Sequence, residues 1–231
     1  MVQVNPEKLF IRVKFRKVGN LQYISHLDLV RTMHKVIVRA DLPLWYTEGF
    51  NPKPKMIFAA PLSIGTESVC EFMDIRLTER MEPDEVIRRL NKNMTREMQA
   101  IEAYYPETKF TDLKWLTYSM VINTKGASSA LAEKCNAALS AEKLEVLKNT
   151  KSGEAVVDIR PLVKSANVTF DGISLNLSCT LCADPSSFLN PEYIVKLLRE
   201  RCGILLSEDL TEESYSIMRE RAYDVNMLEF R

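Results

Sequence analysis

The fold is decided first by residues 9–17, which read LFIRVKFRK. Apolar residues occupy positions 9, 11, 13 and 15 of this run, and basic residues occupy positions 12, 14 and 16. Strict alternation with a period of two indicates a strand that has one face in a core and the other face open. We therefore expect Arg12, Lys14 and Arg16 to share the open face of the first strand.

A helix is predicted to follow this strand, after a break at Gly19 and Asn20. Ser25 stands three residues before Asp28, a spacing that resembles a capping box, in which side chains satisfy the first free amides of a helix. The helix should run to about residue 40. Its expected buried stripe, set by steps of three and four residues, is Leu27, Val30, Met33, Ile37 and Ala40.

The segments that follow complete the order strand, helix, strand, strand, helix, strand. Strands are predicted at 56–62, 69–77 and 98–105, with a helix at 83–93 that begins with a proline. This order is typical of a ferredoxin-like module.

The second half repeats this order in outline, although not in sequence. Helices are predicted at 128–139 and 192–201, and the expected strands are 116–124, 144–148, 156–160, 167–170, 173–181 and 215–225. We therefore predict an α+β fold of two tandem ferredoxin-like (βαββαβ-type) domains with antiparallel sheets. The predicted domains are 1–107 and 115–231, and the role of residues 207–231 stays open.

The composition is that of a soluble globular protein. The chain has 231 residues, of which 46% are hydrophobic and 27% are charged. No run approaches the roughly 18 apolar residues of a membrane-spanning helix, and the start lacks the layout of a secretory signal. Five scattered cysteines fit reduced thiols better than a disulfide framework. We expect a cytoplasmic protein that does not contact a membrane.

A net charge of zero hides an uneven distribution of charge. Residues 1–60 carry ten Lys and Arg against four Asp and Glu, so the rest of the chain carries an excess of six acidic groups. A positive region beside an acidic remainder can steer a polyanion to one place. The alternative is that these charges are solvated and compensate one another.

The segment from Glu48 to Lys55 has a composition suited to single-stranded RNA. It combines an aromatic ring, Phe50, and an amide, Asn51, with two prolines and two lysines, Lys53 and Lys55. Bases stack on aromatic faces, amides bind base edges and lysines contact phosphates. The alternative is that Phe50 is buried and the prolines only shape the loop.

Ser25, His26 and Asp28 raise the question of a catalytic triad. Ser25 and Asp28 are expected to cap the helix, and a triad needs its base between the other two groups in space. His26 could bind a phosphate or move a proton at the start of the helix, or it could be a buried histidine that joins helix and loop. It is a weak catalytic candidate, and in an enzyme that acts on RNA Lys14 or Arg31 would stabilise a phosphate beside it.

Cysteine spacing does not predict a metal site. Cys179 and Cys182 have a spacing found among metal ligands, but residues three apart in a strand point to opposite faces. The sequence also lacks a glycine-rich phosphate loop and the triple-cysteine signature of a radical SAM enzyme. We expect neither a metal nor a cofactor on this chain.

Several phrases of the first 75 residues resemble a known bacterial family. They are SHLDL at 25–29, RADLP at 39–43, GFNPKP at 49–54, PLSIG at 61–65 and Glu71. The chain resembles the radical-SAM-linked protein family of unknown function, over roughly residues 9–200. The resemblance implies a radical SAM protein as partner, encoded beside the chain or fused to it. The family loop commonly has His or Arg where this chain has Lys53.

Three hypotheses about function follow. The leading one is an accessory protein of a radical SAM system, without catalytic activity of its own, that binds or presents tRNA or rRNA for modification. The second is an enzyme acting on RNA through His26, and the third is a protein-interaction module that contacts the radical SAM partner and no nucleic acid. For the leading hypothesis, the predicted RNA-binding residues are Lys14, Arg16, His26, Arg31, Lys35, Arg39, Phe50, Asn51, Lys53 and Lys55.

Overall fold

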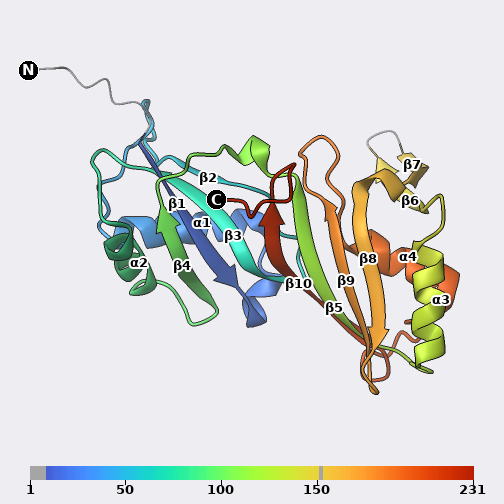
Figure 1. Ribbon diagram of the computed structural model, residues 1–231. Coiled ribbons are helices and arrows are strands. Elements are labelled where there is room, and N and C mark those ends of the chain that lie inside the picture. Colours follow the sequence, from blue (N-terminus) through green and yellow to red (C-terminus); the bar gives the residue numbers. More distant parts are fainter. Residues whose placement is uncertain (1–8, 151–152) are drawn as a thin grey trace, which may run out of the picture. The chain divides into compact units, whose positions relative to one another are not determined.

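In the computed structural model, which describes residues 9–150 and 153–231, the chain divides into two units. One unit comprises the residues up to Phe110 together with Arg231, and the other is Thr111–Phe230. Each unit combines two α-helices with antiparallel strands (Figure 1). The predicted α+β class and the antiparallel pairing are confirmed.

The first unit is built in the predicted element order. Its elements are β1 (Phe10–Lys17), α1 (His26–Arg39), β2 (Met56–Phe58), β3 (Thr66–Arg76), α2 (Pro83–Asn91) and β4 (Met98–Tyr104). β1 pairs with β3 on one side and β4 on the other, and β2 pairs with β3, all antiparallel. The strand order within this unit is therefore β4–β1–β3–β2.

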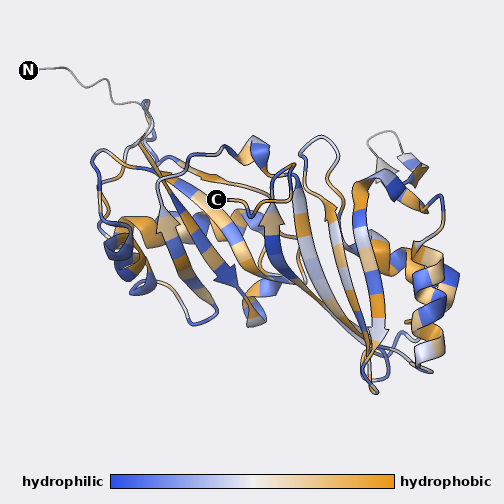
Figure 2. Ribbon diagram, viewed as in Figure 1, coloured by the Kyte–Doolittle hydropathy of each residue, from blue (hydrophilic) through white to orange (hydrophobic). Residues whose placement is uncertain are grey.

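Both helices of the first unit pack on the apolar face of β1. Ile11, Val13 and Phe15 are fully buried and share a core with residues of α1 and α2. Figure 2 shows the alternation of hydrophilic and hydrophobic residues along β1 that produces this two-faced strand. The charged positions of β1 consequently lie on the face of the sheet that α1 and α2 do not cover.

The predicted buried stripe of α1 was partly wrong. Leu27 is 56% exposed and Val30 is only half-buried, whereas Leu29 and Val36 join Met33, Ile37 and Ala40 in the core. Apolar residues recur at steps of three and four along two neighbouring lines of this helix. Spacing alone could not show which line faces the sheet.

Arg12 departs from the expected open face. Its side chain is fully buried, while Lys14 is half-buried and Arg16 is exposed. The alternation placed Arg12 on the correct face, but this part of the face is covered by other residues of the first unit, including Thr108 and Phe110.

The second unit repeats the element order with one insertion. Its elements are β5 (Trp115–Asn123), α3 (Ser129–Leu139), β6 (Glu145–Thr150), β7 (Gly153–Asp158), β8 (Val163–Phe170), β9 (Leu175–Cys182), α4 (Glu192–Cys202) and β10 (Ser214–Tyr223). Four strands pair antiparallel in the order β10–β5–β9–β8, and β6 and β7 form a separate hairpin.

Residues 207–231, whose role the sequence left open, include β10, a strand of this sheet. β10 pairs with β5 along its length, interrupted by one irregularity between Arg219 and Arg221. α3 packs against β8 and against α4 (Figure 1). Within residues 9–150 and 153–231, none of the helices has both the length and the apolar character needed to cross a membrane.

Candidate functional site

The start of α1 uses Ser25 and Asp28 as a cap. The Ser25 hydroxyl accepts a hydrogen bond from the Asp28 amide at 3.1 Å and donates one to the Asp28 carboxylate at 2.7 Å. The Ser25 hydroxyl is the main cause that lowers the pKa of Asp28. Both groups are thus occupied in stabilising the first turn, and the arrangement is not that of a Ser–His–Asp triad.

His26, the first residue of α1, packs against Phe58 of β2. Its ring meets the Phe58 ring edge-on, with centroids 5.4 Å apart and planes at 80°, and Phe58 in turn contacts Phe15 at 6.2 Å. The His26 ring is half-buried, and the contact joins the start of α1 to the strand β2. Whether His26 also acts on a ligand stays a prediction.

The three predicted cations of α1 are exposed but lie at different places. Arg31 donates to Asp28 at 3.3 Å in the first half of the helix. Arg39 stands in the last turn, in a pocket with residues of α2, about 20 Å from the start of the helix by its 14-residue length. Lys35 lies between them.

Residues 45–55 form a projecting hairpin, which we call the Phe50 hairpin. The Thr47 amide donates to the Lys53 carbonyl at 2.9 Å, and the Lys55 amide donates to the Trp45 carbonyl at 3.0 Å. Lys53 also donates its amide to the Thr47 hydroxyl at 3.1 Å. Backbone bonds therefore hold the two arms together, and Gly49, Phe50 and Asn51 at the tip are exposed.

The Phe50 hairpin is anchored to β3 at its base. The Trp45 amide donates to the Arg76 carbonyl, and the Arg76 amide donates to the Lys55 carbonyl, both at 3.0 Å. The Arg76 guanidinium lies 3.9 Å from the centroid of the Trp45 ring. At the tip, Gly49 has φ of 117°, a conformation that favours glycine, and Phe50 is completely exposed.

The predicted polar residues of this hairpin also face solvent. Asn51, Lys53 and Lys55 are all exposed. Lys53 lies close enough to His34 of α1 that its charge helps to lower the pKa of His34, after burial, which is the larger cause. The Nδ1 atom of His34 is buried and has no hydrogen-bond partner within the described residues. The hairpin and the middle of α1 are therefore neighbours.

The cations of β1 are separated from this surface. Lys14 lies over the Phe72 ring at 5.9 Å, and Arg16 donates to the Arg96 carbonyl at 2.9 Å. Because β1 presents these residues on the face opposite α1, they do not join the Phe50 hairpin in one patch. The ten predicted RNA-binding residues thus fall into groups on both faces of the sheet and at both ends of α1.

Sequence reasoning missed a buried ion pair on the face of the sheet away from the helices. The Arg12 guanidinium donates to both carboxylate oxygens of Asp74, at 2.7 and 2.9 Å, and to the hydroxyl and carbonyl of Thr108 at 2.9 and 3.1 Å. It also lies 4.3 Å from the centroid of the Phe110 ring. The sequence predicts both strands that carry these residues, but it does not reveal the register in which they pair.

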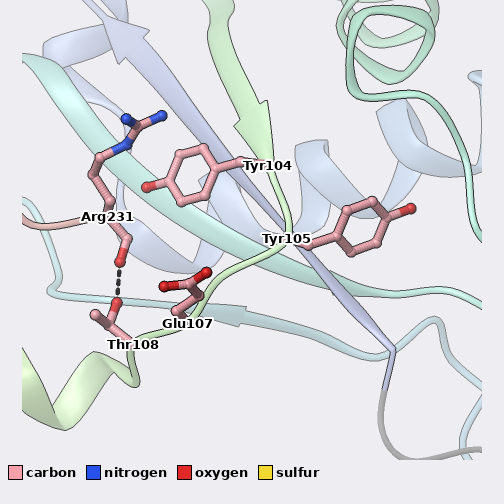
Figure 3. A pocket seen from close by; sticks show the side chains of 5 residues that line it. All are labelled: Tyr104, Tyr105, Glu107, Thr108 and Arg231. Carbon is pink, nitrogen blue, oxygen red and sulfur yellow. Dashed lines mark hydrogen bonds between the residues drawn. The ribbon is translucent and has the colours of Figure 1, made fainter.

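A pocket of about 310 Å³ lies beside this ion pair, lined by Tyr104, Tyr105, Glu107, Thr108 and Arg231 (Figure 3). The Thr108 hydroxyl donates to the carbonyl of Arg231, as the dashed line in Figure 3 marks, and the Arg231 guanidinium pairs with Glu102. The Tyr104 hydroxyl is buried without a partner within residues 9–150 and 153–231, and burial raises its pKa to about 12. These groups form no recognisable acid–base pair.

The cysteines lie mainly in the core. Cys179 is buried, and Cys182 lies half-buried near the Ser187 hydroxyl at 3.5 Å. Within the described residues, no group of three or more His, Cys, Asp or Glu side chains could hold a metal ion.

Comparison with known proteins identifies a family and a fold. Residues 11–191 match the model of a family described as an uncharacterized protein conserved in bacteria (DUF2344). None of the curated proteins matches the chain.

Two solved structures are similar to the chain at 10% identity. A chain in the crystal structure of a Cbf5–Nop10–Gar1 complex has a TM-score of 0.50 and covers 93% of this chain, which spans only 49% of that one. An unknown protein from Galdieria sulphuraria has a TM-score of 0.26 over 92% of this chain and 99% of its own, a score too low to indicate a shared fold. At such identity the first similarity concerns the fold alone.

Proposed function

The chain belongs to this uncharacterized bacterial family, DUF2344, and from that premise we propose that it binds a single-stranded segment of RNA as the accessory protein of a radical SAM enzyme. The RNA would be a tRNA or rRNA that the enzyme modifies. The radical SAM partner rests on the resemblance of residues 25–71 to proteins linked with such enzymes.

The exposure of Phe50 is the observation that carries the proposal. Full burial of such a ring is worth about 1.5–3 kcal/mol, so an exposed ring leaves this free energy to be gained on binding. Stacking of a base on an aromatic side chain contributes about 1–3 kcal/mol. Because Phe50 is completely exposed at the tip of a hairpin, either face of its ring is open to a base.

The neighbours of Phe50 suit the rest of a nucleotide. Asn51 can bind a base edge, and the exposed Lys53 and Lys55 can contact phosphates. The hydrogen bonds between the two arms and the prolines at positions 52 and 54 restrict the free hairpin. A restricted loop loses less conformational entropy when it binds.

We also propose that the two units are tandem ferredoxin-like domains, with boundaries at 1–107 and 115–231. Support comes from the strand orders β4–β1–β3–β2 and β10–β5–β9–β8, which are equivalent once β6 and β7 are treated as an insertion. In each unit, apart from that insertion, the elements follow one another along the chain in the order strand, helix, strand, strand, helix, strand.

We further propose that the chain has no catalytic activity of its own. This part is supported by the use of Ser25 and Asp28 as a helix cap and by the packing of His26 against Phe58. The rival hypothesis of an RNA-acting enzyme predicts RNA turnover by the purified chain that is lost in His26→Gln.

The proposal is tested by titrating a fluorescent single-stranded RNA of mixed sequence with the purified chain at several salt concentrations. Phe50→Ala should weaken binding by about 5- to 150-fold, the equivalent of one lost stacking contact, without changing the salt dependence. Lys53→Gln/Lys55→Gln should lower the slope of log K against log salt by about 1.4, because two phosphate contacts are lost.

Matched controls lie in the second unit. Ile173→Ala removes another exposed apolar side chain from a hairpin, and Lys143→Gln removes another exposed lysine. Neither should change RNA affinity by more than about twofold, since surface changes away from a site are nearly neutral. Absent or salt-insensitive binding, or equal losses in Phe50→Ala and Ile173→Ala, would contradict the proposal.

The partner is tested by co-purification of a tagged chain with the radical SAM protein encoded beside it. The proposal expects the complex to form with the wild type and with Phe50→Ala. If Phe50→Ala instead abolishes the complex while RNA never binds, the hairpin is a protein-docking element and the RNA part is wrong.

A further inference from the structure

A second basic surface lies where the ends of α1 and α2 meet. The lining of a pocket of about 360 Å³ there includes one acidic residue, Asp41, and four cationic residues, Arg39, Arg88, Arg89 and Lys92. Arg39 comes from the last turn of α1, Arg88 and Arg89 come from the last turn of α2, and Lys92 follows directly after it. A cation in the last turn of a helix interacts favourably with the helix dipole. This effect acts on each helix separately, so it does not explain why cations from two helix ends line one pocket.

Two of the guanidinium groups are held in place by one carboxylate. Arg88 donates to Glu85 at 2.7 and 2.6 Å, and Arg89 donates to the same carboxylate at 2.7 Å. These bonds lower the pKa of Glu85 to about 2, so the carboxylate stays charged at neutral pH. Arg89 is fixed further by donating to the Asp41 carbonyl at 2.6 Å.

The other two cations have no such acceptor. Arg39 and Lys92 are exposed and make no ion pair within the described residues. The Asp41 carboxylate is fully exposed and lies 4.0 Å from Arg89. Four cations therefore face two carboxylates, Glu85 and Asp41, which leaves a surplus of two positive charges.

We infer that this pocket binds a terminal phosphate group, which Arg39 and Lys92 hold beside the fixed pair Arg88 and Arg89. A phosphate monoester carries about −1.5 to −2 charges near pH 7, which matches the surplus, whereas a carboxylate or a phosphodiester carries one. Guanidinium groups bind phosphate oxygens through paired hydrogen bonds. The inference is independent of the RNA proposal, because no residue of the Phe50 hairpin lines this pocket.

The first experiment titrates the full chain with inorganic phosphate by calorimetry, at an ionic strength kept constant with chloride. Arg39→Gln/Lys92→Gln should weaken phosphate binding about tenfold or more, since two charge-assisted contacts are removed. This variant leaves Arg88, Arg89 and their bonds to Glu85 intact, and circular dichroism verifies that it folds. Lys53→Gln/Lys55→Gln, which removes two charges from the Phe50 hairpin, should bind phosphate like the wild type.

A second experiment distinguishes the source of the phosphate. It compares a short RNA that carries a 5′-phosphate with the same RNA ending in a 5′-hydroxyl. A preference of about tenfold for the phosphorylated end that disappears in Arg39→Gln/Lys92→Gln assigns the pocket to an RNA end. Phosphate binding with no such preference assigns it to a small phosphorylated molecule.

The inference is overturned if the wild type binds neither phosphate nor the phosphorylated end, or if Arg39→Gln/Lys92→Gln binds them unchanged. If the Phe50 hairpin does not bind RNA while the pocket binds phosphate, the proposed function is contradicted and the assignment of this pocket stands.

Discussion

The buried ion pair of Arg12 and Asp74 is expected to matter for the stability of the first unit. Because the guanidinium is fully buried and Asp74 accepts two of its hydrogen bonds, Asp74→Ala removes the carboxylate that pairs with a buried charge inside the first unit. We expect this change to lower the free energy of unfolding by about 3–5 kcal/mol. Urea denaturation followed by circular dichroism measures the loss.

Two further variants separate the buried charge from the lost packing. Arg16→Ala, at an exposed position of the same strand, should change the free energy of unfolding by no more than about 0.5 kcal/mol. Arg12→Met/Asp74→Leu, which replaces both charges by apolar groups, should be more stable than Asp74→Ala. If the double variant is the least stable of the three, the pair contributes more than charge compensation.

Single residues also mark the limit of sequence reasoning. The period of two placed Arg12 with Lys14 and Arg16, but it could not show that Asp74 lies opposite Arg12, because register depends on pairing between distant segments. For Phe50 the composition of its segment raised both a stacking role and a buried one. Its complete exposure contradicts the buried role and depends on the hairpin, not on local sequence, and the stacking role stays a prediction.

At the scale of elements, Glu213 joins three segments of the second unit. It stands before β10 and accepts hydrogen bonds from the Ser207 amide at 2.5 Å, the Lys125 amide at 2.8 Å and the Thr124 hydroxyl. The Ser207 amide is the largest of the causes that lower the pKa of Glu213 to about 2 from 4.5. The hydrogen-bonded Glu213 carboxylate therefore stabilises the folded state above about pH 4.5. This stabilisation is lost as the pH falls toward 2, because the unfolded chain then binds the proton more readily.

Glu213→Gln should therefore make the dependence of unfolding free energy on pH shallower between about pH 4.5 and 3. Urea denaturation at pH 3, 4, 5 and 6 gives this slope for the wild type and the variant. Glu142→Gln removes an exposed carboxylate from the same unit and serves as the control. An unchanged slope in Glu213→Gln would mean that these hydrogen bonds do not favour the charged carboxylate.

Helix α1 shows which features of an element a sequence can specify. Ser25 and Asp28 were expected to cap its start, and the observed bonds between them agree with that capping role. The buried face was predicted less well, because Leu27 and Val30 fit the same spacing as the residues that are buried. A cap depends on neighbours within one turn, whereas the choice of face depends on the sheet beneath.

At the scale of the whole molecule, the element order of both units followed from periodicity and turn residues. The separation of the predicted RNA-binding cations onto the two faces of the sheet could not be derived in this way. Alternation along β1 shows that its charges share a face, but it does not show that α1 covers the other one. Likewise, the pocket formed by Arg39, Arg88 and Arg89 unites residues that are about 50 positions apart in sequence, so no local pattern predicts it.

The cysteines allow the packing of both units to be tested together. Of the five, Cys70 in the first unit and Cys135, Cys179 and Cys202 in the second are buried, and Cys182 is half-buried. Burial raises the pKa of Cys135 and Cys179 to about 12, and the thiolate is the reactive form. We expect a thiol reagent such as Ellman's reagent at pH 8 to modify one cysteine rapidly in the folded protein and all five in denaturant.

Cys182→Ser identifies the reactive group, because it should leave almost no rapid modification of the folded protein while the denatured variant shows four thiols. The rates of the slow thiols then report local opening, since a buried cysteine reacts only when the structure around it opens. Rapid modification of Cys135 or Cys202 in the folded wild type would show that the contact between α3 and α4, which contain these residues, opens readily. The packing of α3 against α4 described above would then be wrong.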